Sequence, residues 1–358
     1  MPAGFYSLPV KQITRETSEA VSIEFDVPTH LSSQFNYKAG QYLTFSIVIN
    51  GEEVRRSYSV CSSPVTNANP VIAVKQVENG RMSTYLNTQL KEGDIIDVMP
   101  PMGKFILEPN SSATNHYFMF GGGSGITPLI SIIKTALLTE PNSKCYLFYA
   151  NRNEESIIFR EELDALEENP NLKIFYSLDE PNADWSGHSG YLTENKVSEL
   201  IRQELGLNYP VAHYYTCGPG VMMKIVENGL KSTGVRDENI NVEYFTSVVK
   251  EEAKEDVATA VNYSEEVIER TIKVEVFGEQ KEVTVKPEET ILIAAQDVGL
   301  DPPYSCTIGV CTTCRARLRS GKASMEEREG LSDAEIDDGY ILTCQAHPLS
   351  DDVDLIYE

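Results

Sequence analysis

Long hydrophobic runs and basic residues are both scarce in this sequence of 358 residues. No apolar run reaches the roughly 18–20 residues that a membrane-spanning helix needs, and residues 1–14 lack the charged-then-apolar pattern of a secretion signal. We therefore expect a soluble, cytoplasmic protein. Lys and Arg number 30 against 54 Asp and Glu, so the net charge is −24. Because that charge repels phosphate polyanions, nucleic acid and anionic membranes are disfavoured as partners. A basic patch on another protein fits the charge, and so does a role in solubility alone.

Cysteines are few and unevenly placed, which excludes a secreted disulfide framework. There are seven, an odd number. Three stand alone in the sequence: Cys61, Cys145 and Cys217. The other four lie in the last sixty residues, three of them within nine positions of one another. In a cytosolic chain, such a cluster indicates metal binding.

The clustered cysteines have the plant-type [2Fe–2S] spacing. Three lie in one loop and the fourth follows thirty residues later: Cys306, Cys311, Cys314 and Cys344. Gly309 allows the backbone to wrap close to inorganic sulfide, and the neighbouring hydroxyl residues can bring hydrogen-bond donors near the sulfurs. These are Ser305, Thr307, Thr312 and Thr313. A four-cysteine zinc site is the alternative, but zinc modules usually combine two closely spaced pairs. The spacing therefore predicts an iron–sulfur cluster on these four thiolates.

The length suggests two or three domains, and 41% hydrophobic residues suffice for a core in each. Residues 1–110 are β-rich. Asn50-Gly51 separates two strand-like runs, 42–49 and 52–60, and this dipeptide is a strong hairpin signal. Short further runs broken by Gly and Pro follow. The pattern predicts a small antiparallel β-barrel.

Residues 111–246 alternate buried-type strands with helices, which predicts a parallel, helix-covered α/β sheet. The expected strands are 116–120, 145–150, 172–178 and 212–218, and the expected helices are 129–138, 155–168 and 221–234. We expect a surface turn at 186–191. Residues 247–266 are charged and alanine-rich, and we interpret them as a linker.

Residues 267–358 form a third unit, beginning with a hairpin and a short helix that ends at Gly299. The acidic excess concentrates in this part of the chain. Residues 265–358 hold 21 acidic and 9 basic side chains. About a quarter of the length therefore carries half of the net negative charge.

A glycine-rich loop, 121–128, joins a strand to a helix in the second domain. Its glycines, including Gly123, permit close approach of the backbone to a diphosphate, and the helix amino terminus after Thr127 favours negative charge. A tight turn of any α/β domain is the alternative. Thr216 and the following residues Cys217, Gly218 and Pro219 end a later strand, and ligands of open α/β sheets bind at the carboxyl ends of strands. A buried cysteine without a functional role is the alternative for Cys217.

Two polar segments of the first domain are candidates for holding a phosphorylated aromatic ligand. The first is Arg56, Ser57, Tyr58 and Ser59. An arginine can bind phosphate, and a tyrosine two residues on shares its face and can stack on an aromatic ring. The second segment, after the next strand, is Gly80, Arg81, Met82 and Ser83, with Lys75 as a weaker candidate. A solvated strand face is the alternative for the first segment.

In combination, these motifs resemble the ferredoxin–NADP reductase-like flavoprotein family. The order is RSYS, GRMS, GGGSGITP, CGP and a terminal Glu243-Tyr244-Phe245. The added CTIGVCTTC segment resembles a plant-type ferredoxin domain. The resemblance covers nearly the whole chain and implies a multidomain fold: an antiparallel β-barrel FAD domain, an α/β parallel-sheet NAD(P) domain and an α+β β-grasp ferredoxin domain.

The resemblance also implies roles at matching positions. Arg56, Ser57, Tyr58 and Ser59 hold FAD, with Tyr58 stacked on one isoalloxazine face and Ser59 near N5. Residues 80–83 contact the pyrophosphate. Thr127, Cys217, Gly218 and Pro219 place the nicotinamide over the flavin. Phe245 covers the other flavin face, and Glu243 is a proton or hydrogen-bond partner. Asn151 and Arg152 meet the adenosine half. Arg152 can pair with a 2′-phosphate there, and an exposed arginine at the start of a helix is the alternative. Relatives carry FAD or FMN, and GRMS with Arg56 favours FAD.

The implied activity is electron transfer. NAD(P)H gives a hydride to the flavin, and single electrons then pass through the [2Fe–2S] cluster to an oxygenase or epoxidase component. That order of centres is similar to the reductase components of bacterial multicomponent oxygenases. Two acceptors stay open: the di-iron epoxidase of phenylacetyl-CoA in phenylacetate degradation, and a Rieske oxygenase such as 3-ketosteroid 9α-hydroxylase. The resemblance favours NADPH and allows NADH. A zinc-stabilised adaptor and a component that passes electrons to a dehydrogenase are the other hypotheses.

Overall fold

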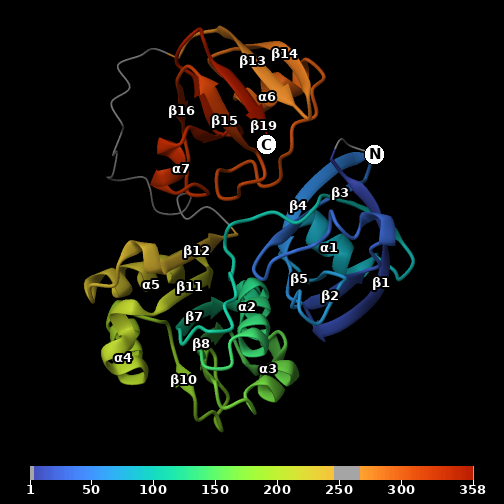
Figure 1. The fold of residues 1–358 in the computed structure, drawn as a ribbon. Coiled ribbons are helices and arrows are strands. Elements are labelled where there is room, and N and C mark those ends of the chain that lie inside the picture. Colours follow the sequence, from blue (N-terminus) through green and yellow to red (C-terminus); the bar gives the residue numbers. More distant parts are fainter. Residues whose placement is uncertain (1–3, 246–266, 358) are drawn as a thin grey trace. The chain divides into compact units, whose positions relative to one another are not determined.

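The computed structural model describes residues 4–245 and 267–357 (Figure 1). The described residues form two compact units. One holds residues 7–54 and 58–245, and the other holds residues 267–357 together with residues 4–6 and 55–57. The linker predicted at 247–266 lies outside the described residues. No helix among the described residues is long and apolar enough to cross a membrane.

Six strands at the amino-terminal end form one sheet, which closes into a small barrel. They are β1 (Tyr6–Thr17), β2 (Ala20–Phe25), β3 (Tyr42–Ile49), β4 (Glu52–Ser59), β5 (Val71–Lys75) and β6 (Ile95–Val98). They lie in the order β4-β3-β6-β1-β2-β5. A bridge from Val60, just after β4, to Ile72 on β5 joins the two edge strands. The predicted antiparallel barrel is confirmed.

The predicted hairpin turn joins β3 to β4. Asn50 has φ +55° and Gly51 has φ +85°, and a two-residue turn of this hand needs positive φ at both positions. A short helix in the barrel domain, α1 (Arg81–Thr88), follows β5. It begins at the GRMS segment, which the sequence did not predict to be helical. The 3₁₀ turn Thr29–Leu31 completes this domain.

The second domain is a parallel sheet in the order β10-β9-β8-β7-β11-β12. Its strands are β7 (His116–Gly122), β8 (Lys144–Asn151), β9 (Leu172–Leu178), β10 (His188–Ser189), β11 (His213–Gly218) and β12 (Ile240–Tyr244). Its helices are α2 (Ile126–Thr139), α3 (Arg160–Leu166), α4 (Glu194–Leu205) and α5 (Gly220–Ser232). Four 3₁₀ turns lie at Gly123–Gly125, Glu154–Ser156, Gly206–Val211 and Asp237–Asn239.

Successive residues of β7 point to opposite faces of this sheet, as a strand requires. Tyr117 and Met119 lie in one core with side chains of α2 and α3. Phe118 and Phe120 lie in a second core with side chains of α4 and α5. The predicted helix-covered parallel sheet is therefore confirmed. The turn expected at 186–191 is wrong in part, because His188–Ser189 forms the edge strand β10, parallel to β9.

The carboxyl-terminal unit is a mixed sheet in the order β14-β13-β19-β15-β17, together with a small sheet of β16 and β18. The strands are β13 (Arg270–Val276), β14 (Glu279–Val285), β15 (Arg315–Ser320), β16 (Ala323–Met325), β17 (Tyr340–Leu342), β18 (Ala346–Pro348) and β19 (Asp354–Tyr357). The helices are α6 (Ile291–Asp297) and α7 (Asp333–Asp337). Side chains of α6, among them Ile291 and Ala295, share a core with Val274 and Leu355. This arrangement is the predicted α+β β-grasp unit.

Candidate functional site

Three predicted site positions form one row across the carboxyl edge of the parallel sheet. Cys217 on β11 is in register with Gly121 on β7 and with Glu243 on β12. The strands are parallel, so all three residues lie at the same edge, where ligands of open α/β sheets bind. Residues separated by more than 120 positions in the sequence are brought together in this way.

The barrel domain contributes Ser59 to the same place. The hydroxyl Oγ of Ser59 donates a hydrogen bond to Oε2 of Glu243 over 3.2 Å. Burial raises the pKa of the Glu243 carboxyl to about 8, and the hydrogen bond from Ser59 offsets part of that rise. The carboxyl group is therefore mostly protonated at neutral pH, and it can donate as well as accept a hydrogen bond. Phe245, two residues on, leaves 37% of its surface exposed.

Cys217 and Thr127 are both buried at this edge. Burial, and then the nearby Glu243 carboxyl, raise the pKa of the Cys217 thiol well above its usual range. The thiol is therefore neutral, so it serves as a small apolar surface and not as a nucleophile. The Thr127 hydroxyl donates to the carbonyl of Ser124 over 3.0 Å. It thus stabilises the first turn of α2.

Most glycines of the loop are needed for contacts within the protein. A Cβ on Gly125 would overlap the carbonyl oxygen of Cys217, and one on Gly122 would lie 2.6 Å from Cδ of Pro219. Gly218 has equally little room, because a Cβ there would lie 2.9 Å from the backbone nitrogen of Gly122. Gly123 differs: its φ is +52° and a Cβ would meet nothing within 4 Å. The loop therefore packs on the end of β11, and Gly123 is the glycine that faces open space.

The helix amino terminus in the barrel domain suits a diphosphate. Gly80 precedes α1, and no side chain caps this end of the helix, so the first backbone N–H groups of α1 remain available to an anion. The side chains of this segment have internal partners. Arg81 donates to the carbonyl of Ile49 over 3.0 Å and pairs with Glu52 at 2.8 Å. The hydroxyl of Ser83 accepts the N–H of Val77 over 3.1 Å, and Met82 is buried.

The remaining flavin candidates lie on or near β4. The ring of Tyr58 contacts that of Phe45, with 5.8 Å between centroids. Arg56 is exposed, and its guanidinium donates to the carbonyl of Arg55 over 2.7 Å. Lys75 on β5 lies 3.9 Å from the carboxylate of Glu19. Ser57 lies between Arg56 and Tyr58, on the alternate face of the strand.

Sequence reasoning missed the residues that join the barrel to the parallel-sheet domain. Ser131 on α2 donates to the carbonyl of Ser62 over 2.6 Å, and Lys134 donates to that of Cys61 over 3.1 Å. The hydroxyls of Ser63 and Thr135 share a hydrogen bond of 2.8 Å. We call these three hydrogen bonds the latch. They fix α2 against residues 61–63. The sequence signalled this contact only by isolated polar residues, such as Ser131 and Lys134, within an otherwise apolar helix.

The four clustered cysteines meet in the carboxyl-terminal unit. The sulfurs of Cys314 and Cys344 lie 3.2 Å apart. Hydrogen bonds from the thiols of Cys311 and Cys344 hold the pKa of the Cys306 thiol well below its usual range. All four are free cysteines that contact one another through their thiols. In the described ranges, no three or more His, Cys, Asp or Glu side chains are arranged to hold a metal ion. Four converging sulfurs are the donor set that a [2Fe–2S] cluster takes.

The loop around these cysteines is positioned by its own hydrogen bonds. Thr343 donates its hydroxyl to the carbonyl of Cys314 over 2.9 Å and accepts one from Tyr357 over 2.7 Å. Gly309 has φ +82°, and a Cβ there would lie 2.6 Å from Cβ of Glu327. The Thr307 hydroxyl donates to the carbonyl of Cys306 and not to a sulfur. The hydroxyl of Thr313, by contrast, lies 3.5 Å from the Cys311 sulfur.

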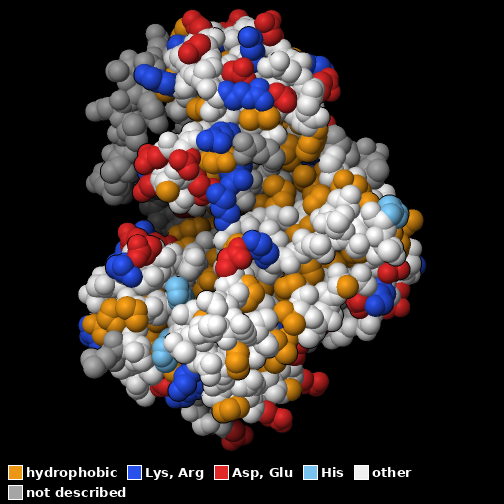
Figure 2. Space-filling model, viewed as in Figure 1, with side chains coloured by type: hydrophobic (Ala, Val, Ile, Leu, Met, Phe, Trp, Pro, Cys, Tyr) orange, Lys and Arg blue, Asp and Glu red, His pale blue; other side chains and the backbone are white. Residues whose placement is uncertain are grey.

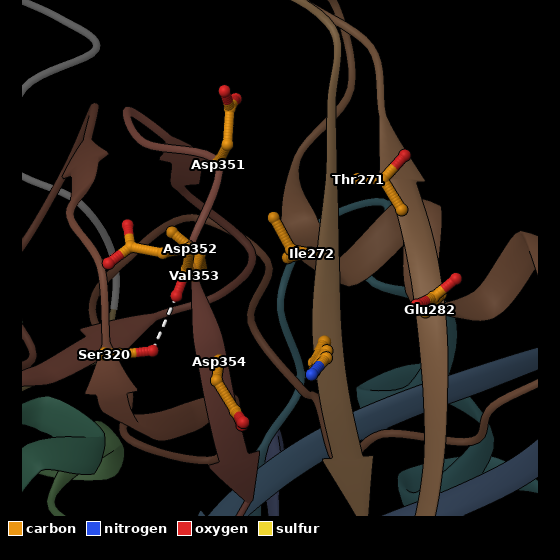
Figure 3. A pocket seen from close by; sticks show the side chains of 9 residues that line it. Thr271, Ile272, Glu282, Ser320, Asp351, Asp352, Val353 and Asp354 are labelled. Atoms are coloured by element: carbon orange, nitrogen blue, oxygen red, sulfur yellow. Dashed lines mark hydrogen bonds between the residues drawn. The ribbon is translucent and has the colours of Figure 1, made fainter.

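A pocket of about 380 Å³ lies elsewhere in the carboxyl-terminal unit (Figure 3). Three aspartates, Asp351, Asp352 and Asp354, line it together with Lys273 and Ser320. The hydroxyl of Ser320 donates to the carbonyl of Asp352 over 2.6 Å. None of the cysteines lines the pocket, so we assign it to the acidic surface of this unit.

Comparison with known proteins agrees with this geometry. Residues 7–106 match the oxidoreductase FAD-binding domain, residues 119–228 the oxidoreductase NAD-binding domain and residues 274–349 the 2Fe-2S iron-sulfur cluster binding domain. One subunit of the 1,2-phenylacetyl-CoA epoxidase of Escherichia coli (strain K12) is 35% identical over 98% of this chain and 96% of its own length. The chain belongs to this family of iron–sulfur flavoprotein reductases. The resemblance noted in the sequence is confirmed.

Other members of the reductase family are also similar to the chain. The ferredoxin reductase component of the 3-ketosteroid-9-alpha-monooxygenase of Rhodococcus rhodochrous is 33% identical over 96% of this chain and 94% of its own length. Phthalate dioxygenase reductase, a solved structure, is 25% identical with a TM-score of 0.60, over 99% of this chain and 98% of that one. An intact type IV self-sufficient cytochrome P450 monooxygenase shares the fold at 19% identity and a TM-score of 0.70. The match covers 98% of this chain and 41% of that protein.

The reductase family settles the cofactors and the kind of reaction. The chain is an electron-transfer oxidoreductase that uses FAD, a nicotinamide dinucleotide and a [2Fe–2S] cluster. FAD, and not FMN, fits the matched domain. When bound, the flavin supplies the step between a two-electron hydride donor and a one-electron carrier.

Proposed function

We propose that this chain is the reductase component of a multicomponent oxygenase, with a phenylacetyl-CoA epoxidase as its electron acceptor. The observation that carries the proposal is the 35% identity to the epoxidase protein of Escherichia coli along almost the full length of both chains. Electrons enter from NAD(P)H and leave from the carboxyl-terminal unit. A 3-ketosteroid monooxygenase is the second candidate acceptor, because the reductase of that system is 33% identical. The cytoplasmic location expected from the sequence stays a prediction.

In this proposal, the row at the carboxyl edge of the parallel sheet receives the nicotinamide. Cys217 gives the ring a small apolar surface, because its buried thiol is neutral. Glu243 holds a proton on its carboxyl group at neutral pH, and the hydroxyl of Ser59 keeps that carboxyl in place. Phe245 follows on the partly exposed end of β12, where it excludes water from the flavin until the nicotinamide enters.

The binding sites of the two diphosphates and of the cluster irons are assigned from the groups that remain available to bind them. The amino terminus of α1, at Gly80, takes the flavin diphosphate. Arg56 and Tyr58 on β4 are the further flavin contacts. Gly123 takes the diphosphate of the dinucleotide, because it alone in the loop faces open space. In the carboxyl-terminal unit, the thiolates Cys306, Cys311, Cys314 and Cys344 ligate the two irons.

Reconstitution tests the acceptor. The purified chain, NADH or NADPH, and the oxygenase component of the phenylacetyl-CoA epoxidase are mixed with phenylacetyl-CoA, and epoxide formation is measured. A parallel mixture contains the oxygenase component of the 3-ketosteroid monooxygenase and its steroid substrate. We expect epoxide formation with the epoxidase component, and none when the Cys344→Ala variant is used in place of the unsubstituted protein. Turnover with the steroid system alone would move the assignment to the second candidate.

A further inference from the structure

The nucleotide-binding edge of the parallel sheet has two chemically different ends. Glu243 and Cys217 lie at the end formed by β12 and β11, and the glycine loop follows β7, the next strand in the sheet. β8 and β9 lie beyond β7 on the other side. On the proposed function, the nicotinamide is at β11 and β12 and the diphosphate is at the glycine loop. The adenosine half must then extend over the carboxyl ends of β8 and β9.

Backbone hydrogen bonds hold the residues after β8 and β9 side by side. The two strands end level, with Asn151 opposite Leu178. Beyond that pair, the N–H of Asp179 donates to the carbonyl of Asn151 over 3.0 Å, and the N–H of Glu180 donates to that of Arg152 over 2.7 Å. The side chains of Arg152, Asp179 and Glu180 are all exposed. They therefore line the surface on which the adenosine ribose would lie.

Negative charge predominates at this end. Asp179 and Glu180 supply two carboxylates against the single guanidinium of Arg152. Glu154 adds a third, and the amide of Asn182 donates to it over 2.5 Å, which ties the turn after β8 to the loop after β9. Burial and then the charge of Glu180 raise the pKa of Asp179, while Arg152 lowers it, so the guanidinium already interacts with this carboxylate. Figure 2 shows acidic side chains at the lower end of this domain, below β10, with basic side chains beside that strand.

We propose that Asp179 and Glu180 make this reductase select NADH over NADPH. A carboxylate at the end of a strand accepts hydrogen bonds from the ribose hydroxyls of NADH, whereas the doubly charged 2′-phosphate of NADPH would be repelled. Arg152, which the resemblance allowed to pair with the 2′-phosphate, is one cation near three carboxylates, and its charge already acts on Asp179. The proposal reverses the preference for NADPH expected from the resemblance.

Two nucleotide fragments that carry no hydride test the proposal by binding alone. ADP-ribose and 2′-phospho-ADP-ribose are titrated into the oxidised, full-length holoprotein by calorimetry at low salt. We expect ADP-ribose to bind at least about tenfold more tightly, since each carboxylate near the 2′-position adds a repulsion of order one decade in affinity. In the variant Asp179→Ser/Glu180→Gln, the ratio of the two dissociation constants should shrink by about tenfold or more. That ratio should also depend less on salt concentration.

The matched control is Glu168→Gln. Glu168 is also exposed, but it precedes β9 at the opposite end of the strand, so its loss should leave the ratio unchanged. In steady-state reduction of ferricyanide, kcat/KM should be higher with NADH than with NADPH. The difference should arise from a lower KM for NADH. Equal affinity for the two fragments, or tighter binding of the phosphorylated one, would overturn the inference. If instead neither NADH nor NADPH reduces the flavin, it is the proposed function that fails.

Discussion

Glu243 is a carboxyl group kept protonated under conditions in which a free glutamate is ionised. Its pKa rises to about 8 because burial disfavours the charged form. Ser59 from the barrel and Cys217 on the neighbouring strand fix its position. The same shift affects stability. Between the ordinary value of 4.5 and about 8, the folded state binds more protons than the unfolded state, so this group makes folding less favourable as the pH rises.

The pH dependence of flavin reduction tests this residue. Above pH 8 the proton on Glu243 is lost, so we expect the rate of reduction by NADH to fall with an inflection near 8. Glu243→Gln keeps a hydrogen-bond donor and removes the titration, so its profile should be flat. Stopped-flow absorbance of the flavin measures both. Glu238→Gln, at an exposed position, should keep the wild-type inflection, and an inflection that persists in Glu243→Gln would show that another group titrates.

The sequence motifs predicted which residues lie at the site better than they predicted which groups each side chain contacts. Ser59, Cys217 and Glu243 were singled out from the sequence and do lie together. Arg81 was expected to face a phosphate, but its guanidinium contacts the β3–β4 turn instead. The difference arises because a side chain's partner depends on tertiary distances that no local pattern encodes. The roles assigned to these residues stay predictions.

Among the elements, α2 carries two functions at once. Its amino terminus follows the glycine loop, and its middle turns hold the latch of hydrogen bonds to residues 61–63 of the barrel. Lys134 also forms an ion pair with Glu162 at 2.6 Å. The latch therefore sets the position of the nicotinamide edge relative to the barrel that supplies Ser59.

Loosening the latch should slow hydride transfer without loss of flavin. We expect Lys134→Met to reduce the flavin roughly tenfold more slowly, because a small displacement of positioned groups is costly in rate. The flavin spectrum and the dissociation constant for ADP-ribose should be unchanged. Lys144→Met, at an exposed position at the start of β8, is the control. An unchanged reduction rate in Lys134→Met would mean that the latch only contributes to stability.

Most helices and strands were predicted from strong hydrophobic patterns in the sequence. Elements with weak or short patterns were not predicted. The hairpin at Asn50-Gly51 and the buried strands were recognisable because turn chemistry and apolar runs are local. Helix α4 was not predicted, although Val197, Leu200 and Ile201 form its buried face and Thr193 accepts the N–H of Lys196 at its start. The glycines were attributed to a diphosphate, whereas Gly122 and Gly125 are required by contact with the end of β11. Such close approaches appear only in three dimensions.

For the whole molecule, function depends on the order of its cofactors. The domains matched to FAD, nicotinamide dinucleotide and the [2Fe–2S] cluster follow one another along the chain. Half of the net charge of −24 lies in residues 265–358, the part that carries the four clustered cysteines. An acidic surface there favours an acceptor with a basic docking face, with association that weakens as salt increases.

An anaerobic titration with NADH, followed by visible absorbance, tests the central claim most directly. The account predicts that the flavin bands and the broad iron–sulfur absorbance both bleach in the intact protein. In Cys344→Ala the iron–sulfur absorbance should be absent while the flavin still bleaches, and Cys145→Ala, which removes a lone buried cysteine, should behave like the intact protein. Iron–sulfur absorbance that survives in Cys344→Ala, or an intact protein in which neither centre responds to either nucleotide, would contradict the account.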